Sequence, residues 1–235
     1  MDALAELATE PGRAALFLDV DGVLAPIVER PEEARVPGGV REELRRLAAR
    51  YALVACITGR SSEDAREVVG VPELVYAGEH GLDLAPEAES WAPQIHAFAA
   101  RVDIGRREIK PRAAAFHYRT AADPAAAREA LEAVATAAEA EGLRTRFGRM
   151  VLEILPPVDA SKGTAVKLLL AERGLRRALY AGDDTTDLDG FAALDGLDTA
   201  VRVAVFSDES PEALRERADV VVESPAAFLE LLRRL

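Results

Sequence analysis

Six short apolar runs alternate with helix-like segments along most of this chain, and this alternation restricts its fold more than any other feature. The runs cover residues 14–20, 52–58, 74–78, 178–183, 202–206 and 218–224, and the apolar residues in each are consecutive rather than alternating with polar ones. Strands buried on both faces have this pattern. Helix-like segments over 40–51, 61–70, 162–174, 187–194 and 224–235 lie between them. The order predicts an α/β fold: a Rossmann-like parallel sheet in a three-layer αβα arrangement.

The stretch from 85 to 157 interrupts this rhythm. It contains a strand-like run at 113–120, an alanine-rich helix at 123–142, and a segment at 143–157 that reads as two strands or one long bent strand. Pro86 and the pair Pro156 and Pro157 lie near its edges, where hinges are expected. We therefore predict a core formed by 1–84 and 158–235, with a smaller α+β domain inserted at 85–157.

Composition excludes several classes of protein. The 235 residues carry a net charge of -12, from 41 acidic and 29 basic residues, which disfavours binding to nucleic acids or anionic membranes. No apolar run is long enough to span a bilayer, and the acidic N-terminal stretch does not resemble a secretory signal. The single cysteine, Cys56, excludes an internal disulfide and a cysteine-rich metal site. We expect a cytoplasmic protein, acting as a monomer.

Acidic side chains lie at the ends of the first and fourth apolar runs. Asp19 and Asp21 end the first run, and the segment GDDTTDLD ends the fourth. Ligands bind outside the carboxyl ends of the strands in open α/β sheets, so Asp19, Asp21, Asp183, Asp184 and Asp187 are expected to converge there. Two carboxylates ~4 Å apart repel by about 4 kcal/mol at an effective dielectric near 20. An all-oxygen cluster of this kind favours a hard divalent cation, and we predict Mg²⁺ bound by these five residues.

Each motif also has a simpler interpretation. Asp-x-Asp-Gly is common in turns, and GDDTTDLD is compatible with the start of a helix. Thr58 to Ser62 fits an N-cap in which Ser61 and Asp64 form a capping box, and Lys162 fits a solvated lysine in a first helical turn. Their joint occurrence, in order and after apolar runs, favours a shared site.

In these motifs the chain resembles the haloacid dehalogenase-like phosphatase superfamily. The matching segments are DVDGVLAP, ITGR, SKGTA and GDDTTDLD. The resemblance implies that Asp19 is the nucleophile and Asp21 the general acid and base. It also implies that Thr58 binds phosphoryl oxygens, that Lys162 balances charge, and that Asp183 anchors Mg²⁺ with Asp184 or Asp187. The inserted segment lies where one class of these enzymes has a cap domain.

A closer resemblance is to the trehalose-6-phosphate phosphatases, carried by DVDGVLAPI, YAGEHGLDL, EIKPRAAAFHYRT, GRMVLEILP and GDDTTDLDGF. It implies hydrolysis of trehalose 6-phosphate, with a sugar phosphate as the small-molecule partner. Carboxylates accept hydrogen bonds from sugar hydroxyls, and cations offset the phosphate dianion. The residues assigned to substrate binding are Gly59, Arg60, His80, Glu108, Lys110, His117, Arg119 and Glu153. His117 is equally compatible with packing, and His80 with closing a turn.

The chain departs from the family pattern at three positions. Leu188 stands where an acidic residue is usual, Thr58 where serine is usual, and Ser161 where aspartate is usual. Thr58 keeps a hydroxyl, whereas Leu188 removes one possible polar contact. Other interpretations therefore stay open: a phosphatase for another sugar phosphate, a phosphomutase, or a non-catalytic sugar-phosphate binding protein of the same fold.

Overall fold

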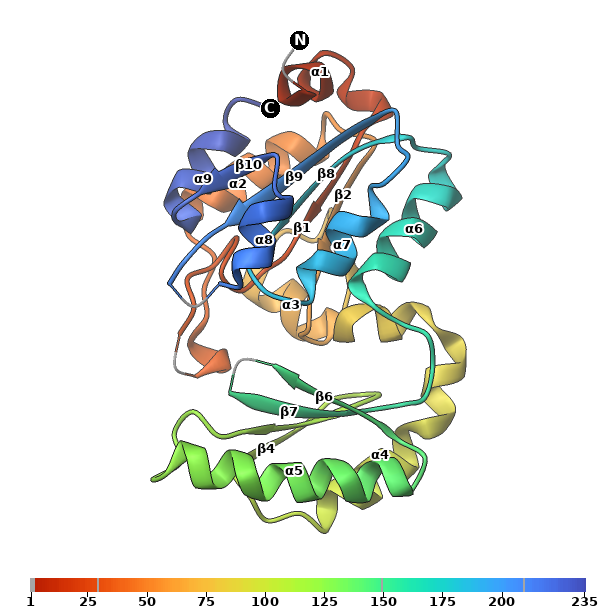
Figure 1. Cartoon of the computed structure of the whole chain (residues 1–235). Coiled ribbons are helices and arrows are strands. Elements are labelled where there is room, and N and C mark those ends of the chain that lie inside the picture. The colour runs from red at the N-terminus through yellow and green to blue at the C-terminus, as the bar shows by residue number, and fades with distance from the viewer. Residues whose placement is uncertain (1–2, 29, 149, 209) are drawn as a thin grey trace. The chain divides into compact units, whose positions relative to one another are not determined.

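The computed structural model describes residues 3–28, 30–148, 150–208 and 210–235. The chain forms two compact units (Figure 1). Unit 1 contains residues 1–81 and 160–235, and unit 2 contains residues 82–159. The predicted boundaries, 84/85 and 157/158, lie within a few residues of these divisions. Each unit has a hydrophobic core of its own.

Unit 1 is built on a six-stranded sheet in the order β10-β9-β8-β1-β2-β3, and every pairing is parallel. The strands are β1 (Ala15–Leu18), β2 (Leu53–Ile57), β3 (Val75–Ala77), β8 (Arg177–Gly182), β9 (Thr199–Val205) and β10 (Val220–Val222). All six predicted strands are present. Strand β1 lies at the centre, between β8 and β2, and all its residues are buried.

Helices cover both faces of this sheet, with α2 and α9 on one side and α6 and α7 on the other (Figure 1). The helices are α1 (Ala3–Thr9), α2 (Gly38–Ala48), α3 (Ser62–Val69), α6 (Lys162–Arg173), α7 (Asp187–Ala193), α8 (Glu212–Arg217) and α9 (Pro225–Leu232). Leu16 and Leu18 of β1 share a core with Leu44 and Leu47 of α2. Phe17, also fully buried, points to the opposite face because side chains alternate along a strand. The predicted three-layer fold is confirmed.

Unit 2 pairs a four-stranded antiparallel sheet with two helices. The sheet order is β4-β5-β7-β6, formed by β4 (Arg106–Ile109), β5 (Ala114–His117), β6 (Arg144–Gly148) and β7 (Val151–Leu155). Helices α4 (Ala92–Ala100) and α5 (Pro124–Ala140) pack on its apolar face, where Phe98 and Leu131 meet Phe116 and Leu152. The segment at 143–157 is thus two strands, as one of the alternatives predicted. Short 3₁₀ segments span Pro11–Arg13, Pro31–Glu33, Glu79–Leu84 and Pro86–Trp91.

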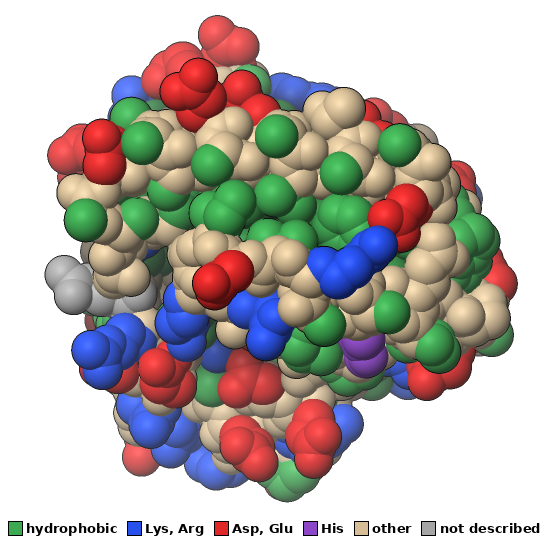
Figure 2. Space-filling view, turned by 90° about the horizontal axis from the view of Figure 1, so that it is seen from below, with side chains coloured by type: hydrophobic (Ala, Val, Ile, Leu, Met, Phe, Trp, Pro, Cys, Tyr) green, Lys and Arg blue, Asp and Glu red, His purple; other side chains and the backbone are tan. Residues whose placement is uncertain are grey.

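Among the helices of the described residues, none combines the length and apolar character needed to cross a bilayer. On the face drawn in Figure 2, Lys and Arg side chains are interrupted by Asp and Glu and lie beside a band of hydrophobic side chains. This face therefore lacks a continuous basic stripe.

Candidate active site

The carboxyl ends of three neighbouring parallel strands carry the polar residues of the candidate site. Asp19 follows β1, Thr58 follows β2 and Asp183 follows β8. The pairing extends one residue past the strands, because the backbone N–H of Asp19 donates to the carbonyl of Ala181 at 3.0 Å and that of Thr58 to Ala77 at 3.0 Å. The parallel register therefore brings these residues to one edge of the sheet, as the sequence predicts.

Asp19 is buried and held on both carboxylate oxygens. Its Oδ1 accepts a hydrogen bond from the backbone N–H of Val20 at 2.7 Å, and its Oδ2 lies 2.7 Å from Lys162 Nζ. Lys162 begins α6 and is almost completely buried, so it is not the solvated lysine of the simpler interpretation. Burial raises the pKa of Asp19 well above its usual value, and Lys162 only partly opposes this.

Asp187 anchors the same lysine from the other side. Its Oδ1 accepts hydrogen bonds from Lys162 Nζ and from the Tyr180 hydroxyl, both at 2.7 Å. Its Oδ2 accepts the backbone N–H groups of Asp183 at 2.9 Å and Asp184 at 3.0 Å. Burial alone would raise the pKa of Asp187, but the charge and hydrogen bond of Lys162, the N–H of Asp184 and the Tyr180 hydroxyl lower it. Burial alone would likewise lower the pKa of Lys162, yet Asp187 and Asp19 raise it above its usual value.

The residues present fit a hard divalent cation. Asp19, Asp183 and Asp187 are all buried, and each offers a carboxylate oxygen within 4.8 Å of the others. The backbone makes room for Asp183 at Gly22, whose φ is +81° and where a Cβ would lie 2.1 Å from Asp183 Oδ2. Among the described residues, Asp21 and Asp184 are not members of this cluster. Each oxygen of Asp187 accepts two hydrogen bonds from protein donors, whereas each oxygen of Asp19 accepts one. The geometry of Asp187 therefore favours a supporting role beside Asp19 and Asp183.

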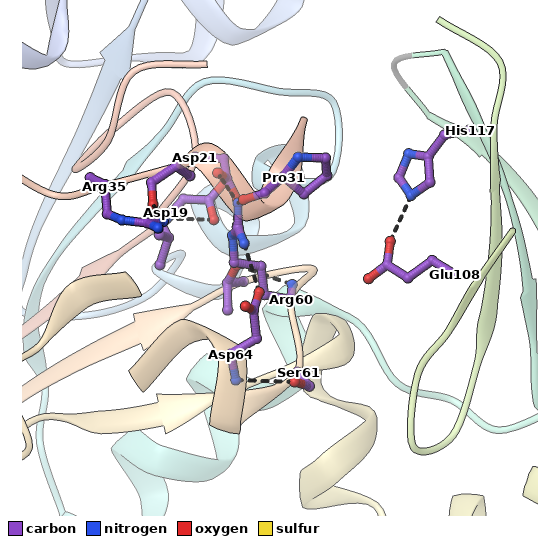
Figure 3. Close-up of polar contacts among 12 residues, drawn as sticks. Asp19, Asp21, Pro31, Arg35, Arg60, Ser61, Asp64, Glu108 and His117 are labelled. Atoms are coloured by element: carbon purple, nitrogen blue, oxygen red, sulfur yellow. Dashed lines mark hydrogen bonds and ion pairs between the residues drawn. The ribbon is translucent and has the colours of Figure 1, made fainter. Parts of the chain in front are cut away.

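Asp21 is instead paired with Arg60 (Figure 3). Arg60 Nε lies 2.7 Å from Asp21 Oδ2, and Arg60 Nη2 lies 2.8 Å from Asp21 Oδ1. Burial alone would lower the pKa of Arg60, but its hydrogen bonds to Asp21 and Asp64 raise it. Arg60 was predicted as a substrate-binding residue, and the structure directs its guanidinium to carboxylates of unit 1.

Two loops of the site are locked together by their backbones. The carbonyl of Thr58 accepts the N–H of His80 at 2.8 Å, and the carbonyl of Arg60 accepts the N–H of Glu79 at 2.7 Å. Glu79 and His80 adopt positive φ values of 49° and 57°. A Cβ at Gly59 would lie 2.6 Å from His80 Nε2, so the imidazole packs directly against the 58–60 loop. Substrate binding by Gly59 and His80 stays a prediction.

The polar face of the unit 2 sheet gathers most of the remaining predicted residues. Glu153 is buried, with Lys110 Nζ 3.0 Å from its Oε1 and Arg146 Nη2 2.5 Å from its Oε2. His117 Nε2 and Glu108 Oε2 lie 2.6 Å apart (Figure 3). Arg119, half-buried, follows β5.

Three functional contacts were missed by sequence reasoning. Arg146 was identifiable in principle, because the β6–β7 register places it opposite Glu153. The Tyr180–Asp187 and Arg60–Asp21 pairs join side chains whose meeting depends on rotamers and loop paths, which a single sequence does not specify.

Comparison with known proteins decides the family. Residues 17–223 match the family model described as trehalose-phosphatase. The chain belongs to the trehalose-phosphatase family. This confirms the resemblance predicted from the sequence, and similarity to solved structures supports the haloacid dehalogenase-like fold.

Two relatives of this trehalose-phosphatase family member are longer proteins. An uncharacterized glycosyl hydrolase of Mycobacterium tuberculosis is 37% identical over 246 residues, which cover 95% of this chain and 18% of the relative. A trehalose-phosphate phosphatase of Mycobacterium marinum is 33% identical over 261 residues, which cover 100% of this chain and 65% of the relative. The chain therefore spans less than two thirds of the length of each of these relatives.

A solved structure shows the same fold. The C-terminal domain of a trehalose-6-phosphate phosphatase from C. albicans has a TM-score of 0.76 at 23% identity, covering 97% of this chain and 93% of the other.

Proposed function

We propose that this chain is a Mg²⁺-dependent phosphatase that hydrolyses trehalose 6-phosphate to trehalose and phosphate through an aspartyl-phosphate on Asp19. The observation that carries the proposal is the buried Asp19, fixed by Lys162 at 2.7 Å beside Asp183, in a member of the trehalose-phosphatase family. A buried carboxylate held this rigidly is an oriented nucleophile.

In the first step a carboxylate oxygen of Asp19 attacks phosphorus, the bond between phosphorus and the sugar oxygen breaks, and Asp21 gives its proton to that oxygen. In the second step Asp21 takes a proton from a water molecule whose oxygen attacks the phosphoryl group. Asp19 is regenerated and phosphate leaves. Thr58 offers a hydroxyl to the phosphoryl oxygens, and Lys162 balances negative charge, since phosphoryl transfer depends on positioning and positive charge.

Mg²⁺ fits the oxygen-rich cluster and would be held by Asp19 and Asp183, with Asp187 in support. When bound, it would neutralise charge on the phosphoryl oxygens. Burial is the first cause of the raised pKa of Asp19, and a cation beside this carboxylate would oppose that shift.

The second unit is the proposed sugar-recognition domain, corresponding to the cap predicted over 85–157, while 1–84 and 158–235 form the proposed catalytic core. Carboxylates and cations on its polar sheet face, including Glu108, Lys110 and Glu153, suit sugar hydroxyls and a phosphate. A cytoplasmic location, a monomeric state and the absence of nucleic-acid or membrane partners belong to the same proposal.

Release of phosphate from trehalose 6-phosphate, measured with and without Mg²⁺, tests the proposal. The wild-type chain is expected to release phosphate only with Mg²⁺, and Asp19→Asn is expected to bind the substrate without turnover. A chelator should abolish the activity reversibly.

The same assay separates the alternatives. A tenfold or greater preference in kcat/KM for another sugar phosphate would overturn the trehalose assignment. Binding of sugar phosphate without phosphate release would favour a non-catalytic protein, to which Leu188 in place of the usual acidic residue would be relevant. Dependence on a phosphorylated activator, with transfer of phosphate back to the sugar, would indicate a mutase.

A further inference from the structure

Arg60 holds Asp21 by both of its carboxylate oxygens (Figure 3). The Nε–Nη2 edge of a guanidinium matches the geometry of a carboxylate, so a two-point pair fixes both the distance and the plane of the acid. The Asp21 side chain is 39% exposed, whereas that of Arg60 is only 8% exposed. A partly exposed aspartate on a loop is therefore oriented by a buried cation.

The remaining donors of Arg60 are directed to other groups of unit 1. Its Nη1 lies 2.6 Å from Asp64 Oδ2, and its Nη2 also donates to the carbonyl of Pro31 at 2.9 Å. A buried guanidinium retains its partners because leaving the charge unpaired is costly. With its two-point edge on Asp21, Arg60 is poorly disposed to grip a phosphate as well.

Asp64 is diverted toward Arg60 from its expected role. It lies in the first turn of α3, where the Ser61 hydroxyl accepts its backbone N–H at 3.2 Å. In a complete capping box its carboxylate would return to the backbone N–H of Ser61. Here that carboxylate pairs with Arg60 instead, so half of the capping box forms and the other half supports the guanidinium.

We infer that Arg60 is a positioning residue that orients Asp21 for proton transfer, and that Asp64 in turn orients Arg60. The inference rests on the proposed function, in which Asp21 protonates the departing sugar oxygen. In this inference Arg60 does not bind the substrate, contrary to the prediction from the sequence. Its guanidinium affects the reaction by orienting Asp21.

A comparison of two leaving groups tests this inference. Trehalose 6-phosphate releases an alkoxide that needs a proton, whereas p-nitrophenyl phosphate releases a stable phenolate that does not. A general acid contributes about 10²- to 10⁴-fold, so Arg60→Lys is expected to lower kcat/KM for trehalose 6-phosphate by about 100-fold. The loss is expected because lysine keeps the charge but lacks the two-point geometry that orients Asp21. The value of kcat/KM for p-nitrophenyl phosphate should change by less than about threefold, because its leaving group needs no proton.

Asp64→Asn is the milder variant, which keeps the inference testable if Arg60→Lys folds poorly. It is expected to lower kcat/KM for the sugar phosphate by about 5- to 10-fold, a small part of the general-acid contribution, with little effect on p-nitrophenyl phosphate. Asp198→Asn is the matched control, since Asp198 pairs with Arg176 at 2.9 Å where both side chains are about 60% exposed. It should leave both values unchanged.

The Asp21→Asn background gives a second readout. If Arg60 acts through Asp21, adding Arg60→Lys to Asp21→Asn should cause little further loss, since the two changes are then not additive. Three results would overturn the inference. They are an equal loss of kcat/KM on both substrates, no loss on either substrate, and full additivity of Arg60→Lys with Asp21→Asn. If the wild-type chain releases phosphate from neither substrate, the proposed function fails and the inference with it, whereas an active wild type with uniform variant losses contradicts the inference alone.

Discussion

Tyr180 shows how a buried network can depend on a residue that takes no part in chemistry. Its hydroxyl donates to Asp187 Oδ1, the oxygen that also holds Lys162, which in turn holds Asp19. Burial raises the pKa of Tyr180 well above its usual value, and Asp187 adds to this. The phenol is therefore a fixed hydrogen-bond donor to a buried carboxylate.

Tyr180→Phe removes this donor without changing the shape of the ring. A hydrogen bond to a charged group contributes about 1.5–3 kcal/mol, so the free energy of unfolding is expected to fall by about that amount in urea titrations. Tyr51→Phe is the matched control, because the Tyr51 hydroxyl is buried with no hydrogen-bond partner among the described residues. Equal effects of the two substitutions would contradict this account.

The lowered pKa of Glu108 predicts that the stability of unit 2 depends on pH. Burial alone would raise its pKa, but the hydrogen bond from His117 and the charges of Lys110 and Arg106 lower it below its usual value. A carboxyl group whose folded pKa is depressed stabilises the fold above its unfolded pKa of about 4.3 and loses that contribution as pH falls through the folded value.

Glu108→Gln should therefore destabilise the protein near neutral pH and matter progressively less below about pH 4. The measurement is the free energy of unfolding of both proteins in urea across this range. Glu129→Gln, on the exposed surface of α5, controls for the loss of a carboxylate as such. A difference between wild type and Glu108→Gln that stays constant with pH would exclude the proposed cause.

At the scale of elements, the turn after β1 depends on a close approach between the backbone of Gly22 and the side chain of Asp183. Gly22 has a φ of +81°, and a Cβ there would meet Asp183 Oδ2 at 2.1 Å. Gly196 has the same φ of +81°, but an added Cβ would find open space. The two positions therefore separate backbone strain from collision.

Gly22→Ala is expected to displace Asp183 and so remove the rise in Tm that Mg²⁺ should give the wild-type chain. Gly196→Ala should lower Tm through backbone strain, by an amount equivalent to about 1–2 kcal/mol, yet keep the response to Mg²⁺. Thermal unfolding with and without Mg²⁺ measures both. A Gly22→Ala protein that responds to Mg²⁺ like wild type would contradict the expectation.

The elements that sequence patterns predicted are those with a clear apolar signal. The six strands of unit 1 each contain a run of consecutive apolar residues, and their parallel order was enough to bring Asp19, Thr58 and Asp183 to one edge. Strand β4 was missed because its sequence, Arg-Arg-Glu-Ile, is polar and largely exposed. The short helix α8 was missed because Leu214 is its only buried residue.

Within the site, the sequence predicted which side chains the backbone would bring to one edge of the sheet. It did not predict which hydrogen bonds and ion pairs those side chains would form. Asp21 and Asp19 are two residues apart, yet one pairs with Arg60 and the other with Lys162. This pairing depends on burial and on the path of loops from distant parts of the chain. It can be read only from the three-dimensional structure.

At the scale of the whole molecule, unit 2 is a continuous segment with its own core, which includes Ile95, Phe116, Leu131 and Leu152. A fragment of residues 82–159 is therefore expected to unfold cooperatively when expressed alone, as measured by circular dichroism in urea. Its stability should be marginal, because small domains bury a smaller fraction of their surface. The absence of a cooperative transition would show that this unit needs the rest of the chain.

A Leu152→Ala fragment provides the control. Leu152 is fully buried, and truncation of such a side chain costs about 2–5 kcal/mol. That loss is comparable to the whole stability of a marginal domain, so the variant fragment should be largely unfolded. A similar midpoint in both fragments would argue against a specific core.

Three glycines of unit 1 lie so close to neighbouring groups that they leave no room for a side chain. An added Cβ would lie 2.6 Å from His80 at Gly59, 2.5 Å from the Asp189 carbonyl at Gly163 and 2.3 Å from the Tyr180 ring at Gly190. In a saturation mutagenesis library, these codons should be depleted as strongly as the codon for Asp19. A fitness map of this chain would thus mark as indispensable three positions whose residues have no side chain and take no part in the chemistry.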